Sequence, residues 1–200
     1  MKKDINILSK DNLICSNKRG VMMFVQRYST NSQFSDILMS SDGTYLTGLW
    51  FEHSRDSKKH QSDLTFKNLS IFDQTKTWLD LYFSGQVPNF IPPYKINNLT
   101  PFRKQVIEIM KEIPYGNVVT YQDIANKIAK INGISKMSAQ AVGGAVGWNP
   151  ICLIIPCHRV VGTSGNLTGY GGGIQNKVKL LELEKLDMSQ FKIPTKGTAL

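Results

Sequence analysis

The chain has 200 residues, of which 24 are Lys or Arg and 15 are Asp or Glu, so its formal net charge at neutral pH is +9. A hydrophobic content of 41% supports one large or two small cores and excludes a chain that is disordered throughout. Residues 95–200 carry +7 of this charge, against +2 for residues 1–94. We therefore expect the second half to face any phosphate backbone, although basic faces also occur on proteins that bind no nucleic acid.

The lack of long apolar runs indicates where in the cell the protein works, and the cysteine spacing indicates which disulfide or metal sites it could hold. No stretch approaches the length of a membrane span, and the first residues lack the apolar core of a signal peptide, so a cytoplasmic protein is expected. Cys15, Cys152 and Cys157 show no paired short spacing, which argues against a disulfide framework or a zinc ribbon and predicts free thiols. His53 and His60 add no ligand spacing, so no metal site is expected.

Two β-rich runs and one amphipathic helix are predicted in the first half. The strands are Val21–Arg27 and Tyr45–Phe51. Ser70, with Asp73 three residues later, predicts a capping box at the start of the helix. The apolar stripe of this helix, which includes Tyr82, is interpreted as ordinary core.

A proline-rich segment separates the two halves. Residues 87–94 contain three prolines and cannot sustain a helix or a sheet ladder. We therefore predict an N-terminal mixed α/β domain over 1–94, a second domain over 95–187 and a tail over 188–200.

Three short helices are predicted at the start of the second domain. The first begins at Thr100–Pro101, the second begins at a capping box of Thr120 with Asp123, and the third spans 138–146. The last two, joined by a turn at Gly133, match a helix-turn-helix, in which the second helix enters a DNA groove. The third helix carries almost no large side chain, so either a neighbouring helix or a nucleic-acid backbone could approach it closely.

The residue pattern around Cys157 is the strongest candidate for chemistry. Ile151–Ile155 is a short apolar run, predicted to be a buried strand, and Pro156-Cys157-His158-Arg159 follows it directly. A thiol attacks only as thiolate, and the adjacent His158 and Arg159 offer a base and a positive charge. On an extended segment Cys157 and His158 would point to opposite faces, so a turn or a bridging water is required. The pair by itself is equally compatible with a buried structural cysteine, which is our interpretation of Cys152.

A glycine-rich segment follows the candidate nucleophile. Residues 167–173 read Leu-Thr-Gly-Tyr-Gly-Gly-Gly and lead into a helix that carries Glu184. The run lacks the strand and downstream acid of a phosphate-binding loop, so a pocket wall in which Tyr170 approaches a flat ligand is the better interpretation.

From Thr100 to Glu184 these residues closely resemble the O6-alkylguanine-DNA alkyltransferases, and the first half matches more loosely. The matching motifs are Ile113-Pro114-Tyr115-Gly116, Ala141-Val142-Gly143-Gly144-Ala145, Asn149-Pro150, Ile155-Pro156-Cys157-His158-Arg159-Val160, Leu167-Thr168-Gly169-Tyr170 and Leu180-Leu181-Glu182-Leu183-Glu184.

The resemblance implies a fold, a reaction and a partner. The N-terminal domain would be ribonuclease H-like. The second, mostly helical domain would hold a winged-helix-like helix-turn-helix and a short active-site strand. The protein would be a monomer that binds double-stranded DNA containing O6-alkylguanine, with O4-alkylthymine as a second candidate substrate. It would move the alkyl group onto its own Cys157 once and irreversibly, without a cofactor.

The resemblance also implies individual roles. Cys157 would be the acceptor, His158 would draw its proton through a water, and Glu184 would orient His158. Tyr121 would crowd the phosphate of the flipped nucleotide and protonate the leaving oxygen, and Asn149 would brace the turn before the active-site strand.

Two further sets of residues follow from the resemblance. The DNA-binding set is Tyr121, Ser138, Ala139, Gln140, Ala141, Gly143 and Arg159, and the substrate pocket is Val160, Leu167, Thr168, Tyr170 and Gly171. One position departs from the family pattern, because Gln140 stands where an arginine usually enters the duplex. A second departure is Gly147, which stands where a basic residue is usual.

Three alternatives remain open from the sequence. A DNA-binding regulator with Cys157 as a sensor would need a helix that reads bases, and 138–145 offers only Gln140. A cysteine hydrolase would need a distant histidine supported by an acid, and His53 and His60 show none nearby. A relative that only binds alkylguanine would lack the nucleophile.

Overall fold

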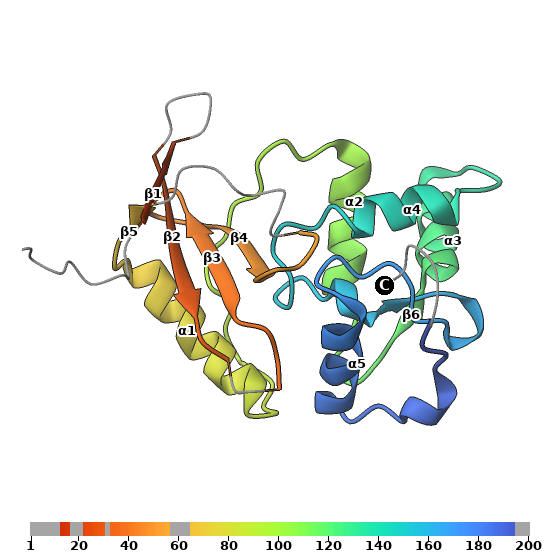
Figure 1. Cartoon of the computed structure of the whole chain (residues 1–200). Coiled ribbons are helices and arrows are strands. Elements are labelled where there is room, and N and C mark those ends of the chain that lie inside the picture. The colour runs from red at the N-terminus through yellow and green to blue at the C-terminus, as the bar shows by residue number, and fades with distance from the viewer. Residues whose placement is uncertain (1–12, 17–21, 31–32, 57–64, 195–200) are drawn as a thin grey trace, which may run out of the picture.

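The computed structural model describes residues 13–16, 22–30, 33–56 and 65–194. His60, considered above as a metal ligand, lies outside these residues. The described chain forms two lobes, a sheet with one helix on one side and a group of helices on the other (Figure 1). Within the described part of the chain, no helix is long and apolar enough to cross a membrane.

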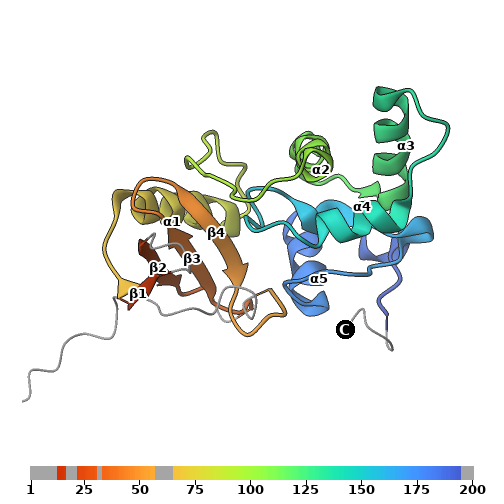
Figure 2. The same ribbon diagram turned by 90° about the horizontal axis from the view of Figure 1, so that it is seen from above.

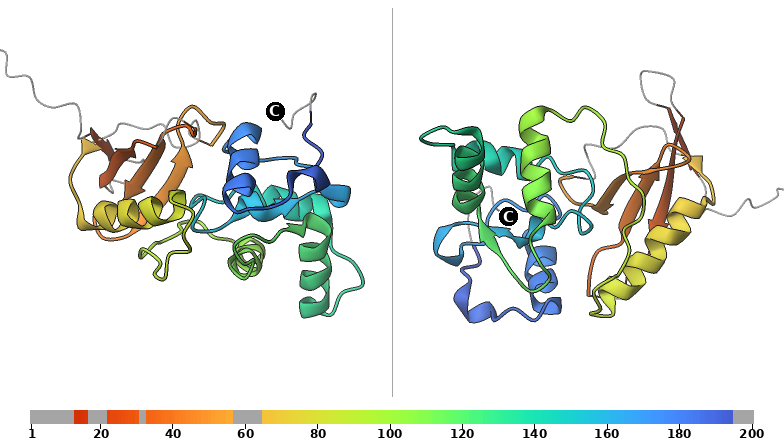
Figure 3. Two further views of the ribbon diagram at one scale, coloured as in Figure 1. Left: turned by 90° about the horizontal axis from the view of Figure 1, so that it is seen from below. Right: turned by 180° about the vertical axis from the view of Figure 1, so that it is seen from behind.

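The N-terminal lobe is a five-stranded sheet covered on one face by a helix (Figures 1 and 3). The strand order is β1-β5-β2-β3-β4, and β5 runs parallel to β2 while the other pairings are antiparallel. The elements are β1 Leu13–Ser16, β2 Met22–Tyr28, β3 Ile37–Ser41, β4 Leu46–Phe51, β5 Thr65–Phe66 and α1 Ser70–Phe83. The two predicted strands correspond to β2 and β4.

Helix α1 buries the apolar stripe that its sequence predicts. Ile71, Phe72, Leu79 and Tyr82 are all at most 2% exposed. The predicted capping box is wrong, because Leu69 is the N-cap and makes no side-chain hydrogen bond, while Ser70 is already helical. The helix is therefore held by packing on the sheet more than by its cap.

The C-terminal lobe is mostly helical, with one short parallel strand pair. Its elements are α2 Pro101–Lys111, β6 Val119–Thr120, α3 Tyr121–Asn132, α4 Ala139–Val146, β7 Val160–Val161 and α5 Ile174–Leu183. Both parts of the predicted capping box of Thr120 with Asp123 are present, and Gly133 ends α3 in the left-handed region at φ 65°. Helices α3 and α4, with α2 beside α4, form the predicted helix pair joined by a turn (Figure 2).

The predicted strand over Ile151–Ile155 is wrong. Only Ile151 makes a strand-like bridge, to Leu49 at the outer edge of β4. The chain then coils into a turn in which Leu153 has a positive φ of 68° and the amide of Ile155 donates to the carbonyl of Ile151. All five side chains are buried. The apolar run thus correctly predicted burial, but β4 offers a single point of pairing and no ladder, so burial is achieved by a turn.

The two lobes share one hydrophobic core, to which β3, β4 and α1 contribute together with α2, α3, α4 and the 151–157 segment. Backbone hydrogen bonds connect the edge of β4 to the second lobe, because the amide of Leu49 donates to Pro150 and the amide of Cys152 donates to Leu49. The segment that precedes the candidate nucleophile is therefore attached to the N-terminal sheet.

The segment after residue 187, predicted as the start of a tail, packs on the second lobe as far as it is described. Met188–Gln190 forms a 3-10 turn. The amide of Lys192 donates to the carbonyl of Gly165, and the amide of Leu167 donates to the carbonyl of Lys192. These bonds hold the loop that follows β7 against the end of the chain.

Candidate active site

Cys157 begins a single 3-10 turn, Cys157–Arg159, which leads directly into β7. Strand β7 pairs with β6 through Val119 and Val160, so the turn is held beside the start of α3. The expected turn is therefore present, and within it Cys157 contacts Asn149 while His158 contacts Glu184.

Asn149 holds this turn from within. Its side-chain oxygen accepts from the amide of Ile151 at 3.1 Å, and its Nδ2 donates to the carbonyl of Ile155 at 2.8 Å. The same Nδ2 lies 3.2 Å from the Cys157 Sγ. The expected bracing role is thus matched by the geometry, with a direct contact to the sulfur in addition.

The Cys157 thiol is buried and neutral in its resting state. Its exposed fraction is 8%. Burial raises the pKa of Cys157 to about 11, although the hydrogen bond from Asn149 and the charge of Lys177 act in the opposite direction. Since a thiol with such a pKa carries its proton at neutral pH, a base is needed to make it a nucleophile.

His158 is a suitable base. It is fully buried, and its Nε2 lies 2.7 Å from Oε1 of Glu184. Because the carboxylate can only accept, Nε2 carries the proton and Nδ1 has a lone pair. Within the described part of the chain, Nδ1 has no hydrogen-bond partner. Burial lowers the pKa of His158, and the opposing effect of Glu184 does not cancel this, so the ring is neutral at neutral pH.

Glu184, the C-cap residue of α5, is surrounded by donors. Besides His158, the Arg159 Nε donates to Oε2 and its Nη2 to Oε1, each at 2.9 Å, and the amide of Gly116 donates to Oε2 at 3.0 Å. Burial alone would raise the pKa of Glu184, but the hydrogen bonds and charges of His158 and Arg159 hold it well below its usual range. The carboxylate is therefore ionised.

Arg159 was expected in the DNA-binding set, and the structure places it elsewhere. Two of its nitrogens bind Glu184, and Nη1 donates to the carbonyl of Ile113 at 2.7 Å. Its side chain is only 11% exposed. Since all of its donor groups point inward, Arg159 belongs to the charge network around His158.

A hollow of about 550 Å³ lies between α3, α4 and the loop that follows β7. Four residues of the expected DNA-binding set line it, namely Tyr121, Ala139, Gln140 and Gly143. The other three do not: Arg159 binds Glu184, Ser138 is the N-cap of α4, and Ala141 is exposed outside the hollow. Such a volume is large enough for a nucleotide-sized ligand.

Tyr121 connects the hollow with the nucleophile. Its hydroxyl donates to the carbonyl of Thr168 at 3.1 Å. Burial, with a smaller contribution from the nearby Cys157, raises the pKa of Tyr121 to about 12, so the phenol keeps its proton. Tyr121 and Thr168 both line the hollow, whereas Cys157 itself does not.

The expected substrate pocket is only partly assembled. Thr168 lines the hollow. Val160 is buried, and its carbonyl accepts from Nζ of Lys177, whereas Tyr170 is 7% exposed and influences the pKa of Cys152. Leu167 instead packs in a second small core with Val161 and helix α5, so it is not a pocket residue. The carbonyl of Gly171 accepts from the amide of Asp56.

Comparison with known proteins places this arrangement in a family. Residues 101–186 match the family described as "6-O-methylguanine DNA methyltransferase, DNA binding domain". A Haemophilus influenzae protein named methylated-DNA–protein-cysteine methyltransferase is 38% identical over 154 residues, which are 75% of this chain and 80% of that relative. A Mycobacterium leprae protein of the same name is 35% identical over 78% of this chain and 90% of its own length. The chain belongs to the methylated-DNA–protein-cysteine methyltransferase family.

Solved structures of the family share the fold. The Mycobacterium tuberculosis protein OGT, solved in complex with DNA, superposes with a TM-score of 0.67 at 34% identity and covers 84% of this chain and 94% of its own. The O6-methylguanine-DNA methyltransferase of Pyrococcus kodakaraensis gives a TM-score of 0.53 at 25% identity, over 82% of this chain and 100% of its own. The mixed α/β architecture expected from the sequence is therefore confirmed.

Sequence reasoning missed a buried lysine in this family member. Lys177, on α5, is 0% exposed, and its Nζ donates to the carbonyl of Val160 at 2.7 Å and to that of Thr168 at 3.3 Å. Burial lowers the pKa of Lys177 to about 8, and the charge of Cys157 acts against this. The ammonium thus braces the wall of the hollow and favours the thiolate. A lysine within the apolar stripe of α5 was the signal that could have found it.

Two more side chains come from the other lobe. Arg55 is the one charged residue among the described residues that line the hollow. Tyr82, on α1, donates its hydroxyl to Oε1 of Glu184 at 2.7 Å. No local sequence pattern assigns Arg55 or Tyr82 to the site, because both reach it only through the docking of the two lobes.

Proposed function

We propose that the protein repairs DNA by moving an alkyl group from O6 of guanine onto Sγ of Cys157. The observation that carries this proposal is the buried arrangement of thiol, neutral base and ionised carboxylate beside a hollow, in a chain of the methylated-DNA–protein-cysteine methyltransferase family. His158 withdraws the thiol proton onto Nδ1 through one water, and Glu184 stabilises the imidazolium that forms.

The bond changes balance without a cofactor. Sγ attacks the alkyl carbon from the side opposite O6, the carbon–oxygen bond breaks, and its electron pair stays on the guanine. Tyr121 gives its proton to the guanine and regains one from His158 through solvent. The products are an unmodified guanine and a thioether, and because the thioether is not readily displaced, each protein molecule acts once.

Reaching O6 in a duplex requires the nucleotide to leave the base stack, at a cost of a few kcal/mol. We assign the hollow lined by Tyr121, Ala139, Gln140 and Gly143 to this nucleotide and its strand, with Ser138 and Ala141 beside it on α4. Thr168, Tyr170, Gly171 and the backbone of Val160 would contact the base. Arg55, which lines the same hollow, would bind a flanking phosphate and compensate for the charge that Gln140 and Gly147 do not supply.

Gln140 should support the base gap by hydrogen bonds and by its bulk. We expect Gln140→Ala to slow repair of an O6-methylguanine duplex about fivefold, the effect of about one hydrogen bond, and to leave repair of the same single strand unchanged. The rate would be measured by intact mass over time. Gln105→Ala, which removes a half-buried glutamine that pairs with Asn132 on α3, is the control. Equal duplex rates for wild type and Gln140→Ala would refute the assignment.

The pH dependence follows from the neutral His158 and the protonated Cys157. His158 must be neutral to accept the proton, and its pKa lies below the ordinary 6.5, so the transfer rate should be level near neutral pH and fall only below 6.5. Attack by thiolate formed without the base would instead give a rate that rises with pH towards about 11. Single-turnover rates between pH 5 and 9 distinguish the two; a steady rise through this range would exclude the His158 mechanism.

Membership of this family also supports proposals about the domains, the oligomeric state, the substrates and the location of the protein. We propose a ribonuclease H-like domain over 1–94 and a domain with a winged-helix-like helix-turn-helix over 95–187. The chain would act as a monomer on double-stranded DNA, with O4-alkylthymine as a second candidate substrate. A cytoplasmic location suits a protein whose acceptor thiol must stay reduced.

The decisive test is direct. The protein is incubated with an oligonucleotide that contains one O6-methylguanine, and its intact mass is measured. We expect one methyl group per chain, located by peptide mapping on Cys157, and no further uptake when fresh oligonucleotide is added. Unchanged mass would refute the proposed function.

A further inference from the structure

Tyr82 reaches the catalytic network from the other lobe. It lies on the last turn of α1, is 1% exposed, and stacks on Trp78. Its hydroxyl is 2.7 Å from Oε1 of Glu184 and 3.2 Å from Nε2 of His158. No other hydrogen bond from the N-terminal lobe to this pair is seen in the described residues.

The hydroxyl is not needed for packing. The ring of Tyr82 meets those of Phe83, Tyr115 and His158 edge-on, contacts that a phenylalanine would preserve. A buried hydroxyl, by contrast, costs free energy unless it is hydrogen-bonded. The Tyr82 hydroxyl therefore needs its hydrogen bonds to Glu184 and His158 to be stable in the interior. In return, it gives these two side chains one more hydrogen-bond partner.

The hydrogen-bond directions are determined by this geometry. Tyr82 has one proton, which it donates to the Glu184 carboxylate. Its oxygen then presents a lone pair to Nε2 of His158, as Oε1 of Glu184 also does. Two acceptors at Nε2 require the proton there, which leaves Nδ1 as the base.

We propose that Tyr82 is a positioning residue for alkyl transfer, which holds the Glu184 carboxylate and keeps His158 in the tautomer whose Nδ1 is free to accept the thiol proton. The inference rests on the proposed function, and it gives the N-terminal lobe a part in the chemistry. Docking of α1 against the second lobe would then be a condition for full reactivity.

Removing the hydroxyl has a defined electrostatic consequence. The charged and titratable groups that face His158 are Tyr82 from α1, Arg159 from its own turn, Lys177 from α5 and Glu184 at the C-cap of α5, while Tyr115 lies beside Tyr82 and Glu184. Without Tyr82 as donor, the Glu184 carboxylate keeps more negative charge and stabilises the imidazolium more strongly. The pKa of His158 then rises. As the pH falls, its ring is therefore protonated, and stops acting as a base, at a higher pH than in the wild type.

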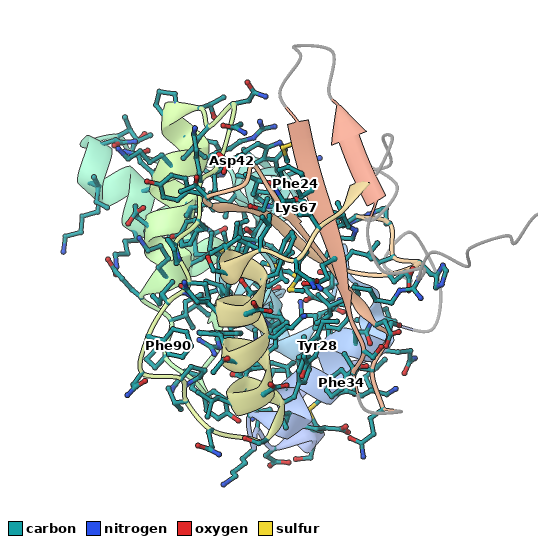
Figure 4. All side chains as sticks on the ribbon, turned by 90° about the vertical axis from the view of Figure 1, so that its left-hand side faces the viewer. Phe24, Tyr28, Phe34, Asp42, Lys67 and Phe90 are labelled. Carbon is teal, nitrogen blue, oxygen red and sulfur yellow. The ribbon has the colours of Figure 1, made fainter. Side chains whose placement is uncertain are left out.

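The test compares Tyr82→Phe with Tyr28→Phe. Tyr28 is a matched control because its hydroxyl also donates to a carboxylate of α1, Asp80, at 2.7 Å, while its ring stacks on Phe83 at the end of that helix. Figure 4 shows Tyr28 beside α1. We expect Tyr82→Phe to slow alkyl transfer at neutral pH about tenfold, the effect of a hydrogen bond to a charged group, because the loss of the fixed carboxylate and of the reactive His158 tautomer outweighs the stronger base. The acid limb of the rate profile should move to higher pH. Tyr28→Phe should change neither.

A second measurement does not depend on activity. With ¹⁵N-labelled histidine, the three histidines of the chain can be titrated by NMR. His158 should show a protonated Nε2 in the wild type and a higher pKa in Tyr82→Phe than in Tyr28→Phe. If the wild type takes up the methyl group but Tyr82→Phe matches it in rate and in His158 titration, only this inference fails. If the wild type takes up none, the proposed function fails, whatever the titration shows.

Discussion

Replacing Cys157 with serine is expected to abolish methyl uptake completely. Serine fills nearly the same space and can still accept from Nδ2 of Asn149, so the turn should persist. The serine hydroxyl, however, is a far weaker acid than a thiol, and His158 cannot deprotonate it appreciably. Intact mass after exposure to O6-methylguanine DNA should show no adduct.

Cys152→Ser is the matched control for this variant. Cys152 is also a buried free thiol, but it lies in the preceding turn and its pKa is raised well above the ordinary range by burial. We expect Cys152→Ser to take up one methyl group as the wild type does, at a stability cost of about 1–3 kcal/mol for the buried hydroxyl. An adduct on Cys157→Ser, or loss of uptake in a folded Cys152→Ser, would contradict the assignment of the acceptor.

Replacing Glu184 with glutamine should reduce both the transfer rate and the stability. The neutral amide cannot stabilise the imidazolium, and its NH₂ can turn His158 to the wrong tautomer. In a comparable triad the loss of charge at the orienting acid costs about 10⁴-fold, so a loss of at least about 100-fold is expected here. Single-turnover rates measure this effect.

The stability change arises because Arg159 loses its counter-ion. Removing one partner of a buried pair costs about 3–5 kcal/mol, which urea unfolding would measure. Because folding lowers the pKa of Glu184, the stability that it contributes is present above its unfolded value of 4.5 and is lost as the pH falls below it. The free energy of unfolding of Glu184→Gln should therefore fall less steeply below pH 4.5 than that of the wild type.

Glu182→Gln is the control, since Glu182 is exposed on the same helix. It should leave the rate and the stability within error of the wild type. A Glu184→Gln protein that reacts at the wild-type rate would exclude the carboxylate from the mechanism.

Most local features were predictable, although the capping box expected at Ser70 is absent. The capping box of Thr120 with Asp123 and the apolar stripe of α1 depend on residues a few positions apart, and both are as expected. The 151–155 run failed as a strand because strand pairing depends on a partner elsewhere in the chain, and β4 provides only Leu49. An apolar run by itself indicates burial, whatever its backbone conformation.

The sequence by itself determined the family and the motif Pro156-Cys157-His158-Arg159, because both are local patterns of residue types. Tertiary structure alone decided which side chains surround the motif. It turned Arg159 inward onto Glu184, buried Lys177 beneath the wall of the hollow and brought Tyr82 across from α1. These contacts join residues up to 102 positions apart, and the one from Tyr82 forms only when the two lobes close on one core. The nucleophile and its base are properties of the motif, whereas the pKa of the thiol and the tautomer of His158 are properties of the fold.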